Sequence, residues 1–203
     1  MSALGDEARV PSRFFHAIKA LGEMPRVIIT TSRRPSRRTR SLVKDLAAVI
    51  DGAVRFTRGH ESLKSLAAMA RTYGIKSIVI VGERKGNPGL LAAYSVGDRG
   101  LSPVATIRIV GVTLSRELRG RSKPRCRYVK RPSDPAALRV AEALSKAFLL
   151  DMYESPPGDY LEVRNEGVMV VVPRAADGGF GGPIIRVLAE VEPGGGSPGQ
   201  AVH

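Results

Sequence analysis

The sequence is poor in cysteine, aromatic residues and long apolar runs, and each scarcity excludes a class of protein. Cys126 is the only cysteine among 203 residues, so neither an intrachain disulfide nor a cysteine-rich zinc site can form. Aromatic residues make up 5% of the chain and tryptophan is absent, which argues against a surface built mainly for base stacking. No apolar run reaches the ~18 residues of a membrane-spanning helix. No secretory signal is visible at the start, so we expect a cytoplasmic protein that does not enter a membrane.

Motifs that carry catalytic or metal chemistry are also missing. The histidines His16, His60 and His203 form no HxxxH or HExxH pattern. The turn RKGNPG at 84–89 lacks the GxxxxGK[ST] spacing of a phosphate-binding loop, and no GxSxG motif occurs. We therefore expect no enzymatic activity, no cofactor, no metal and no small-molecule substrate.

Acidic residues are too few to balance the basic ones, and the imbalance is uneven along the chain. The formal net charge is +13. Residues 1–131 hold 27 Lys and Arg against 9 Asp and Glu, whereas residues 132–203 hold 5 against 10. Such asymmetry indicates an acidic partner that engages the first two thirds of the chain. Nucleic acid is favoured over an anionic membrane surface, because no long basic amphipathic helix or lipidation signal is present.

The basic residues are densest in TTSRRPSRRTRSLVKDL at 30–46, where five arginines occur before the first acid, Asp45. Apolar spacing predicts a helix over 36–50 with Ser36 as its N-cap. The first N–H groups of a helix lack partners and its dipole is positive there, so this helix start favours anions. A helical projection places Arg37, Arg40 and Lys44 opposite the apolar face, with Arg38 on the flank.

Repulsion between these arginines weakens the helix by a few tenths of a kcal/mol per pair, and nothing within the segment offsets it. A phosphate backbone would offset it. The guanidinium group can bind phosphate oxygens bidentately, and arginine outnumbers lysine five to one in this stretch. The competing interpretation is an ordinary solvated basic face.

Further basic positions are weaker candidates for the same surface. Arg58 lies in an Arg-Gly turn, and Arg84 and Lys85 lie in the RKGNPG turn. A second basic run at 116–131 is either a flexible connector or a second contact.

The remaining pattern predicts an α/β fold with a mixed sheet and helical cover. Residues 1–24, with a short amphipathic helix at 13–21, are expected to be peripheral, and 193–203 form a low-complexity tail. The tripeptide Arg-Pro-Ser occurs at 34–36 and again at 131–133, each time before a predicted helix, which suggests two related halves. Strands are expected at 26–31, 54–57, 77–82, 90–96, 104–114 and 184–191, a hairpin at 160–173, and helices at 36–50, 60–73 and 134–153.

The stretch at 30–46, followed by Arg58-Gly59, SLKSLAAMA and RKGNPGLL, resembles the Brix-domain family of ribosome-biogenesis proteins, in its short archaeal form. The resemblance covers roughly residues 25–192. It implies two similar halves, about 25–115 and 116–192, each resembling the anticodon-binding domain of class IIa aminoacyl-tRNA synthetases. The family tends to show Gly-Pro-Arg near its last strand, whereas this chain has Gly182-Pro183-Ile184, so any role of that arginine is not carried over.

What the resemblance implies for function is a non-catalytic assembly factor that binds ribosomal RNA or its precursor, alongside other ribosome-assembly proteins. A tRNA-binding module acting in trans is one alternative. A protein-interaction scaffold, docking its partner on the acidic C-terminal part and the VMVVV strand at 168–172, is another. By motif position, the RNA contacts would fall to Arg33, Arg34, Arg37, Arg38, Arg40 and Lys44, followed by Arg58, Arg84 and Lys85.

Overall fold

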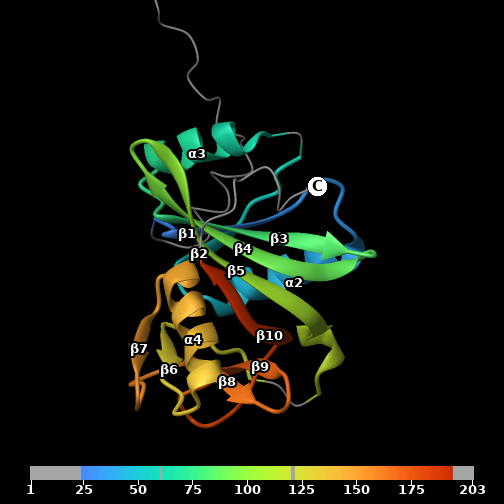
Figure 1. The fold of residues 1–203 in the computed structure, drawn as a ribbon, viewed down its shortest axis with the longest axis vertical. Coiled ribbons are helices and arrows are strands. Elements are labelled where there is room, and N and C mark those ends of the chain that lie inside the picture. The colour runs from blue at the N-terminus through green and yellow to red at the C-terminus, as the bar shows by residue number, and fades with distance from the viewer. Residues whose placement is uncertain (1–23, 60, 120–121, 194–203) are drawn as a thin grey trace, which may run out of the picture.

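The strands of the described residues form one continuous ten-stranded mixed sheet, with helices on its two faces (Figure 1). This computed structural model describes residues 24–59, 61–119 and 122–193. The short helix expected at 13–21 and the tail beyond 193 lie outside the described residues. The predicted mixed α/β architecture is confirmed.

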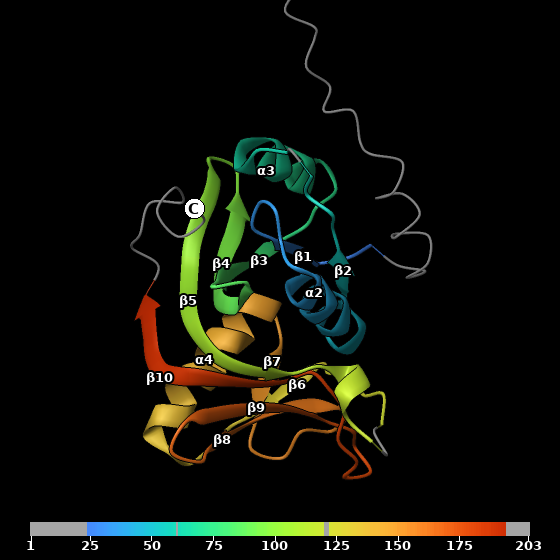
Figure 2. The ribbon, with the colours of Figure 1, turned by 90° about the vertical axis from the view of Figure 1, so that its right-hand side faces the viewer.

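The first half of the sheet is organised around β1 (Val27–Thr31), whose five residues are all buried. It lies between β2 (Ala53–Arg55) and β3 (Ser77–Arg84) and pairs with both in parallel. The antiparallel strands β4 (Asn87–Gly97) and β5 (Gly100–Thr113) follow. β5 is long because it extends from the first half of the molecule, where it pairs with β4, into the second, where it pairs with β10, and it bends between them (Figure 2).

The second half repeats the same topology. β6 (Tyr128–Lys130) pairs in parallel with β7 (Asp151–Tyr153) and β8 (Tyr160–Asn165). The antiparallel strands β9 (Met169–Arg174) and β10 (Ile184–Pro193) complete it, and β10 joins β5. The sheet order β2-β1-β3-β4-β5-β10-β9-β8-β6-β7 is therefore symmetric about the β5–β10 pair. Each Arg-Pro-Ser tripeptide lies at the same place in its repeat, after β1 or after β6.

Helices cover the two faces unequally. α2 (Arg37–Val49) and α4 (Pro135–Phe148) pack on the same face and share one apolar core. α3 (Leu63–Thr72) covers the other face of the first half, over a separate core (Figures 1 and 2). No helix stands between β7 and β8 in the described residues, so the second repeat lacks a counterpart of α3.

Two predictions about the second half are wrong. The helix expected to run to Tyr153 ends at Phe148, because Leu149 takes a left-handed conformation with φ of 55°. The following residues instead pair with β6 as the strand β7, in the position that β2 has in the first repeat. β6 itself lies within the basic run, where no strand was expected, because its three residues give too short a pattern to recognise.

The proposed docking strand is also corrected. β9 lies between β8 and β10, so both of its edges are occupied by neighbouring strands. Met169, Val170, Val171 and Val172 are each 4% exposed or less. This apolar run is a core strand, so it cannot dock a partner, and the scaffold interpretation is left with the acidic C-terminal part alone.

Candidate nucleic-acid interface

The start of α2 is fixed by two separate caps. The Ser36 hydroxyl accepts a hydrogen bond from the Thr39 backbone N–H, as expected of an N-cap. Glu83, at the end of β3, accepts hydrogen bonds from the Ser36 backbone N–H and the Thr39 hydroxyl. Burial alone would raise the pKa of Glu83, but these hydrogen bonds outweigh it and the pKa lies below its ordinary value. The expected open anion site at this helix start is therefore partly taken by Glu83, which leaves the arginine side chains as the free cationic groups.

Only Arg38 in the arginine stretch forms an ion pair within the described residues, although the charge of Arg40 also acts on Glu83. Arg33, Arg34, Arg37 and Arg40 are exposed, and none forms an ion pair within the described residues. Lys44 is also exposed and unpaired there. This exposure agrees with the helical projection, which placed Arg37, Arg40 and Lys44 away from the core.

Arg38 is the exception. Its guanidinium is 2.7 Å from the Oε1 of Glu117 and also donates to the Val112 carbonyl. The hydrogen bond from Arg38 is the main reason that the pKa of Glu117 is lowered. Because this guanidinium already has a carboxylate and a carbonyl as partners, Arg38 is a weaker candidate for an RNA contact than the sequence predicted.

The hairpin between β3 and β4 adds two exposed cations at the same end of the sheet. Lys85 and Gly86 have φ of 51° and 75°, so they form a tight two-residue turn between the paired Arg84 and Asn87. β3 runs parallel to β1, so this turn lies at the end of the sheet where β1 leads into the arginine stretch. The contact of Glu83 with Ser36 brings the two segments together directly. Arg84 and Lys85 thus lie near the predicted surface.

Arg58 does not lie on the surface as expected. It is 6% exposed, and its Nε donates to the Glu61 carbonyl at 2.8 Å. Its Nη1 has no hydrogen-bond partner among the described residues. Burial, followed by the nearby charge of Arg33, lowers the pKa of this guanidinium. The Arg-Gly turn therefore places a cation beneath the arginine stretch.

The second basic run is packed against α2 over its described residues, which contradicts the flexible-connector interpretation for that part. The run begins in a short turn, η1 (Ser115–Glu117), whose Ser115 N–H donates to Asp45 on α2. Arg116 is within 3.4 Å of the Ser41 hydroxyl on the outer face of the same helix. Farther along, the Cys126 N–H donates to the carbonyl of Val49, the last residue of α2, and the Cys126 carbonyl accepts from the Asp51 N–H. Arg125 and Arg127 both pair with the Asp51 carboxylate.

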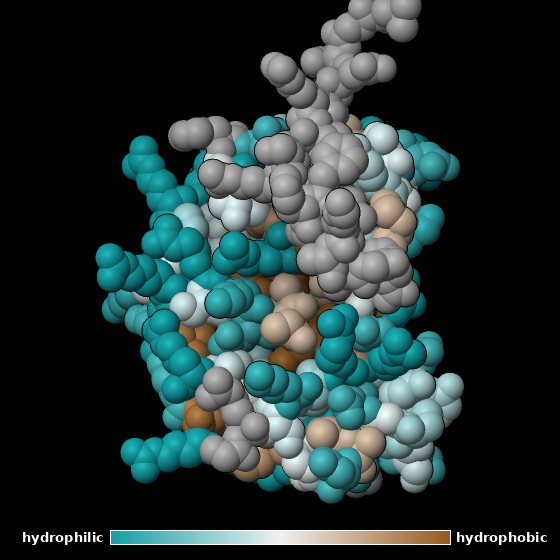
Figure 3. Space-filling view, turned by 180° about the vertical axis from the view of Figure 1, so that it is seen from behind, coloured by the Kyte–Doolittle hydropathy of each residue, from teal (hydrophilic) through white to brown (hydrophobic). Residues whose placement is uncertain are grey.

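The two basic runs therefore share one face of the molecule. Ser41 lies between Arg37 and Lys44 on the helix surface, so Arg116 joins these two cations. Arg119 and Lys123 are exposed farther along the same segment. The face on which α2 and β2 lie is covered mostly by hydrophilic side chains, several of which extend into solvent (Figure 3). The sequence left a second contact at 116–131 open, but no sequence spacing placed Arg116 beside α2.

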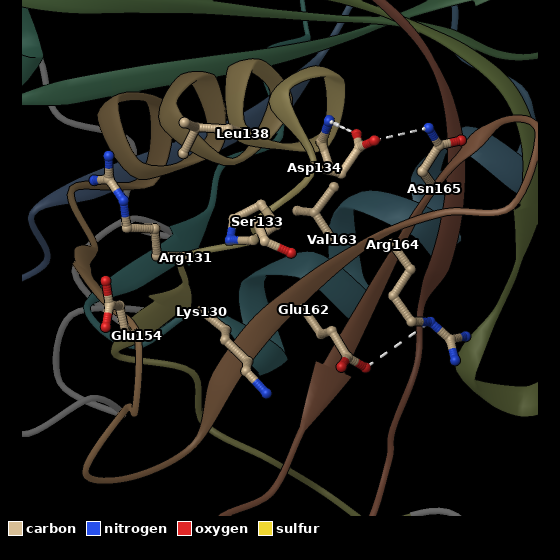
Figure 4. Close-up of a pocket in the computed structure, with 12 residues that line it drawn as sticks. Lys130, Arg131, Ser133, Asp134, Leu138, Glu154, Glu162, Val163, Arg164 and Asn165 are labelled. Carbon is tan, nitrogen blue, oxygen red and sulfur yellow. Dashed lines mark hydrogen bonds and ion pairs between the residues drawn. The ribbon is translucent and has the colours of Figure 1, made fainter.

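The equivalent helix start in the second repeat has a different charge. Asp134 caps α4 by accepting from the Ala137 N–H, and Asn165 on β8 donates to the same carboxylate (Figure 4). The backbone hydrogen bond is the main reason that the pKa of Asp134 is lowered. A cavity of about 820 Å³ opens beside this cap. Its charged lining is balanced, with Lys130, Arg131 and Arg164 facing Asp134, Glu154 and Glu162.

Other chemistry has little support in the described residues. No group of three or more His, Cys, Asp or Glu in that part of the chain could bind a metal ion. Burial raises the pKa of the Cys126 thiol to about 12, so this cysteine is not a reactive nucleophile. None of the described helices is long and apolar enough to cross a membrane.

Comparison with known proteins identifies the family. No family model matches the chain. A probable Brix domain-containing ribosomal biogenesis protein of Aeropyrum pernix is 41% identical over 168 residues, which cover 78% of this chain and 93% of the relative. The chain belongs to the Brix-domain family. The resemblance drawn from the arginine stretch and its following motifs is thus confirmed.

A solved structure and a eukaryotic relative extend the comparison. The crystal structure of a probable ribosomal biogenesis protein from Aeropyrum pernix K1 matches with a TM-score of 0.70 and 37% identity, covering 88% of this chain and 99% of that one. The U3 small nucleolar ribonucleoprotein protein IMP4 of Bos taurus is 37% identical over 73 residues, or 36% of this chain and 25% of that protein. The chain is therefore similar to proteins named as ribosomal biogenesis proteins and, over 73 residues, to a protein named as part of a small nucleolar ribonucleoprotein.

Proposed function

We propose that this Brix-domain protein is a non-catalytic RNA-binding factor in ribosome assembly, which contacts ribosomal RNA or its precursor through the basic face of α2. The observation that carries the proposal is the set of exposed cations without an acidic partner in the described residues. They are Arg33, Arg34, Arg37, Arg40 and Lys44. The names of the relatives, which place them in ribosomal biogenesis and in a small nucleolar ribonucleoprotein, support the same role.

The physical reason for an RNA partner is the arrangement of the charge. Folding places the apolar side of α2 in the core and leaves its basic side outward, where the cations repel one another. Glu83 and Glu117 offset part of this charge, but they are committed to Ser36, Thr39 and Arg38. A polyanion that binds the remaining cations relieves the repulsion and releases condensed counterions.

The test compares two triple variants that remove the same charge. Arg37, Arg40 and Lys44 are replaced together by alanine, and the control replaces Lys64, Arg139 and Lys146, which are exposed on α3 and α4. We expect the α2 variant to lose RNA affinity and to flatten the slope of log K against log salt by about 0.7–0.9 per lost phosphate contact. The control should keep the wild-type RNA affinity and salt slope. The thermal unfolding temperatures of the two variants should stay near that of the wild type. Wild-type affinity in the α2 variant would contradict the proposal.

The family resemblance implies that each half is similar to a synthetase anticodon-binding domain, and that expectation motivates a second candidate, a tRNA-binding module acting in trans. The two candidates predict opposite outcomes when ribosomal RNA fragments compete with bulk tRNA for the protein. Preferential displacement by the ribosomal fragments supports the assembly factor. Preferential displacement by tRNA supports the alternative.

A further inference from the structure

A second cavity, of about 300 Å³, lies between α2 and β2 at the carboxyl ends of β1 and β2. Ligands of open α/β sheets bind outside the carboxyl ends of the strands, and this cavity shares that end of the sheet. The end of β1 contributes Thr31 and Ser32 to its wall, and α2 contributes Arg40 and Val43. The cavity is at the small end of the range for ligand sites, which suits one nucleotide better than a large ligand.

The lining of this cavity is basic and contains no acid. Arg34 comes from the loop before α2, Arg40 from the first turns of the helix, and Arg55 from the end of β2. All three side chains are exposed and form no ion pair in the described part of the chain. The cavity beside α4, in contrast, has three acids among its lining residues. Those acids are balanced by Lys130, Arg131 and Arg164, so the cavity beside α2 is the more favourable environment for a phosphate group.

Arg55 is directed toward this cavity by the alternation of β2. Ala53 belongs to the core shared with α2, and Val54 belongs to the core under α3. Because side chains alternate across a strand, Arg55 lies on the α2 side with Ala53. Phe56 and Val43 are buried and provide an apolar part of the cavity wall.

A further cation, Arg58, lies close to the cavity and forms no ion pair with an acid in the described residues. Arg58 is next to Gly59, which lines the cavity, and its Nη1 has no hydrogen-bond partner among the described residues. The charged group that acts on Arg58 most strongly is another guanidinium, that of Arg33. A buried cation without an acidic neighbour is costly unless an anion approaches it.

We infer that this cavity binds one nucleotide unit of the RNA, with its phosphate between Arg34, Arg40 and Arg55. The sugar or base of that nucleotide contacts the apolar wall formed by Pro35, Val43 and Phe56. The hydroxyl groups of Thr31, Ser32 and Thr57 supply neutral hydrogen-bonding groups around it. The inference depends on the proposed function, and it adds Arg55 and Thr57 to the RNA-contacting residues.

The experiment uses fluorescence anisotropy with a 3′-labelled single-stranded RNA of about ten nucleotides, bearing either a 5′-phosphate or a 5′-hydroxyl. Arg55→Ala removes one cation of the cavity, and Thr57→Leu fills the cavity without changing the charge. Arg71→Ala, on the exposed surface of α3, is the matched control. Thermal unfolding confirms that each variant is folded.

We expect Arg55→Ala to weaken RNA binding about tenfold and to flatten the salt slope by about 0.7. Thr57→Leu should weaken binding to a similar extent with an unchanged slope, and Arg71→Ala should bind as the wild type does. A loss confined to the 5′-phosphorylated RNA identifies a terminal phosphate as the ligand, whereas equal losses identify an internal phosphodiester.

Three results would overturn the inference. Wild-type affinity in both cavity variants, with the α2 triple variant still weakened, would refute the cavity while leaving the proposed function intact. If Arg55→Ala weakens RNA binding and Thr57→Leu does not, Arg55 acts only as surface charge. If the wild type binds a phosphoserine peptide but no RNA, both the cavity inference and the proposed function are wrong.

Discussion

The backbone N–H of Ser36, at the start of α2, donates to the carboxylate of Glu83 at the end of β3, 47 residues along the chain. The same carboxylate accepts from the Thr39 hydroxyl. Glu83 therefore joins the arginine stretch to the strand that leads into the Arg84–Lys85 turn. One acid both caps the basic helix and sets the position of two basic segments relative to each other.

Glu83→Gln should destabilise the fold by about 1–2 kcal/mol, because it weakens charge-assisted hydrogen bonds at a helix start. The amide retains an acceptor oxygen, so the substitution tests the charge and leaves the shape nearly unchanged. Urea unfolding at neutral pH measures the effect. Equal stability of the two proteins would show that the carboxylate charge is not needed there.

The same variant should change the pH dependence of stability. The folded pKa of Glu83 is lowered, so its contribution is complete above the unfolded value of about 4.3 and is lost as the pH falls through the folded value. Glu117 and Asp134 titrate in both proteins and cancel from the difference. The gap in unfolding free energy between wild type and Glu83→Gln should therefore narrow below about pH 4. A gap that stays constant into acid would contradict this assignment.

Arg38 should contribute less to RNA binding than its neighbour Arg37, because Glu117 already binds its guanidinium. We expect the RNA affinity of Arg38→Ala to stay within about twofold of the wild type, whereas the RNA affinity of Arg37→Ala should fall several-fold. Glu117→Gln should strengthen binding, since it frees Arg38 and raises the local charge. Anisotropy titrations at one salt concentration compare the three variants. An equal loss in Arg38→Ala and Arg37→Ala would mean that the RNA displaces Glu117.

The second basic run should act as part of the same RNA surface. Replacement of Arg116, Arg119 and Lys123 by alanine is expected to weaken RNA binding by about tenfold or more and to flatten the salt slope. The variant in Lys64, Arg139 and Lys146 again serves as the charge-matched control. Unchanged binding in the variant of Arg116, Arg119 and Lys123 would limit the interface to α2 and its neighbouring turns.

The features that could be predicted from the sequence are those that depend on the local pattern of residues. Apolar spacing located α2 to within a residue at each end, and its N-cap Ser36 was identified from residue type. The outward direction of Arg37, Arg40 and Lys44 followed from the helical period alone. The Arg-Pro-Ser repeat marked equivalent places in two repeats, because both copies lie in the loop between a first strand and its helix.

What the sequence could not predict depends on contacts between distant segments. Glu83 and Glu117 reach the arginine stretch from positions more than 40 residues away, and no local pattern connects them to it. Arg58 looked like an exposed turn residue, but the surrounding structure buries it. β7 was mistaken for the end of a helix, since its three residues match either period and only pairing with β6 defines it as a strand.

Glycines in the second half of the chain allow the second basic run to take its position. A Cβ at Gly182 would lie 2.8 Å from both the Ser115 Cα and the Leu118 Cδ1, and one at Gly181 would lie 2.6 Å from the Pro124 Cδ. These glycines allow the loop before β10 to approach the segment that carries Arg116. The segment that carries Arg116 therefore packs against the loop before β10 as well as against α2.

Gly182→Ala should displace this segment and destabilise the fold by about 1–3 kcal/mol, because the backbone of Ser115 cannot move without breaking its bond to Asp45. Gly97→Ala is the matched control, since its nearest neighbour would be the Gly100 carbonyl at 3.9 Å and its φ is not positive. Thermal unfolding should separate the two variants, with the control near the wild type. RNA affinity of folded Gly182→Ala should also fall, although no charge has been removed, because Arg116 is no longer held beside Ser41. If the variant keeps its RNA affinity while its stability falls, the position of the second basic run matters for folding alone.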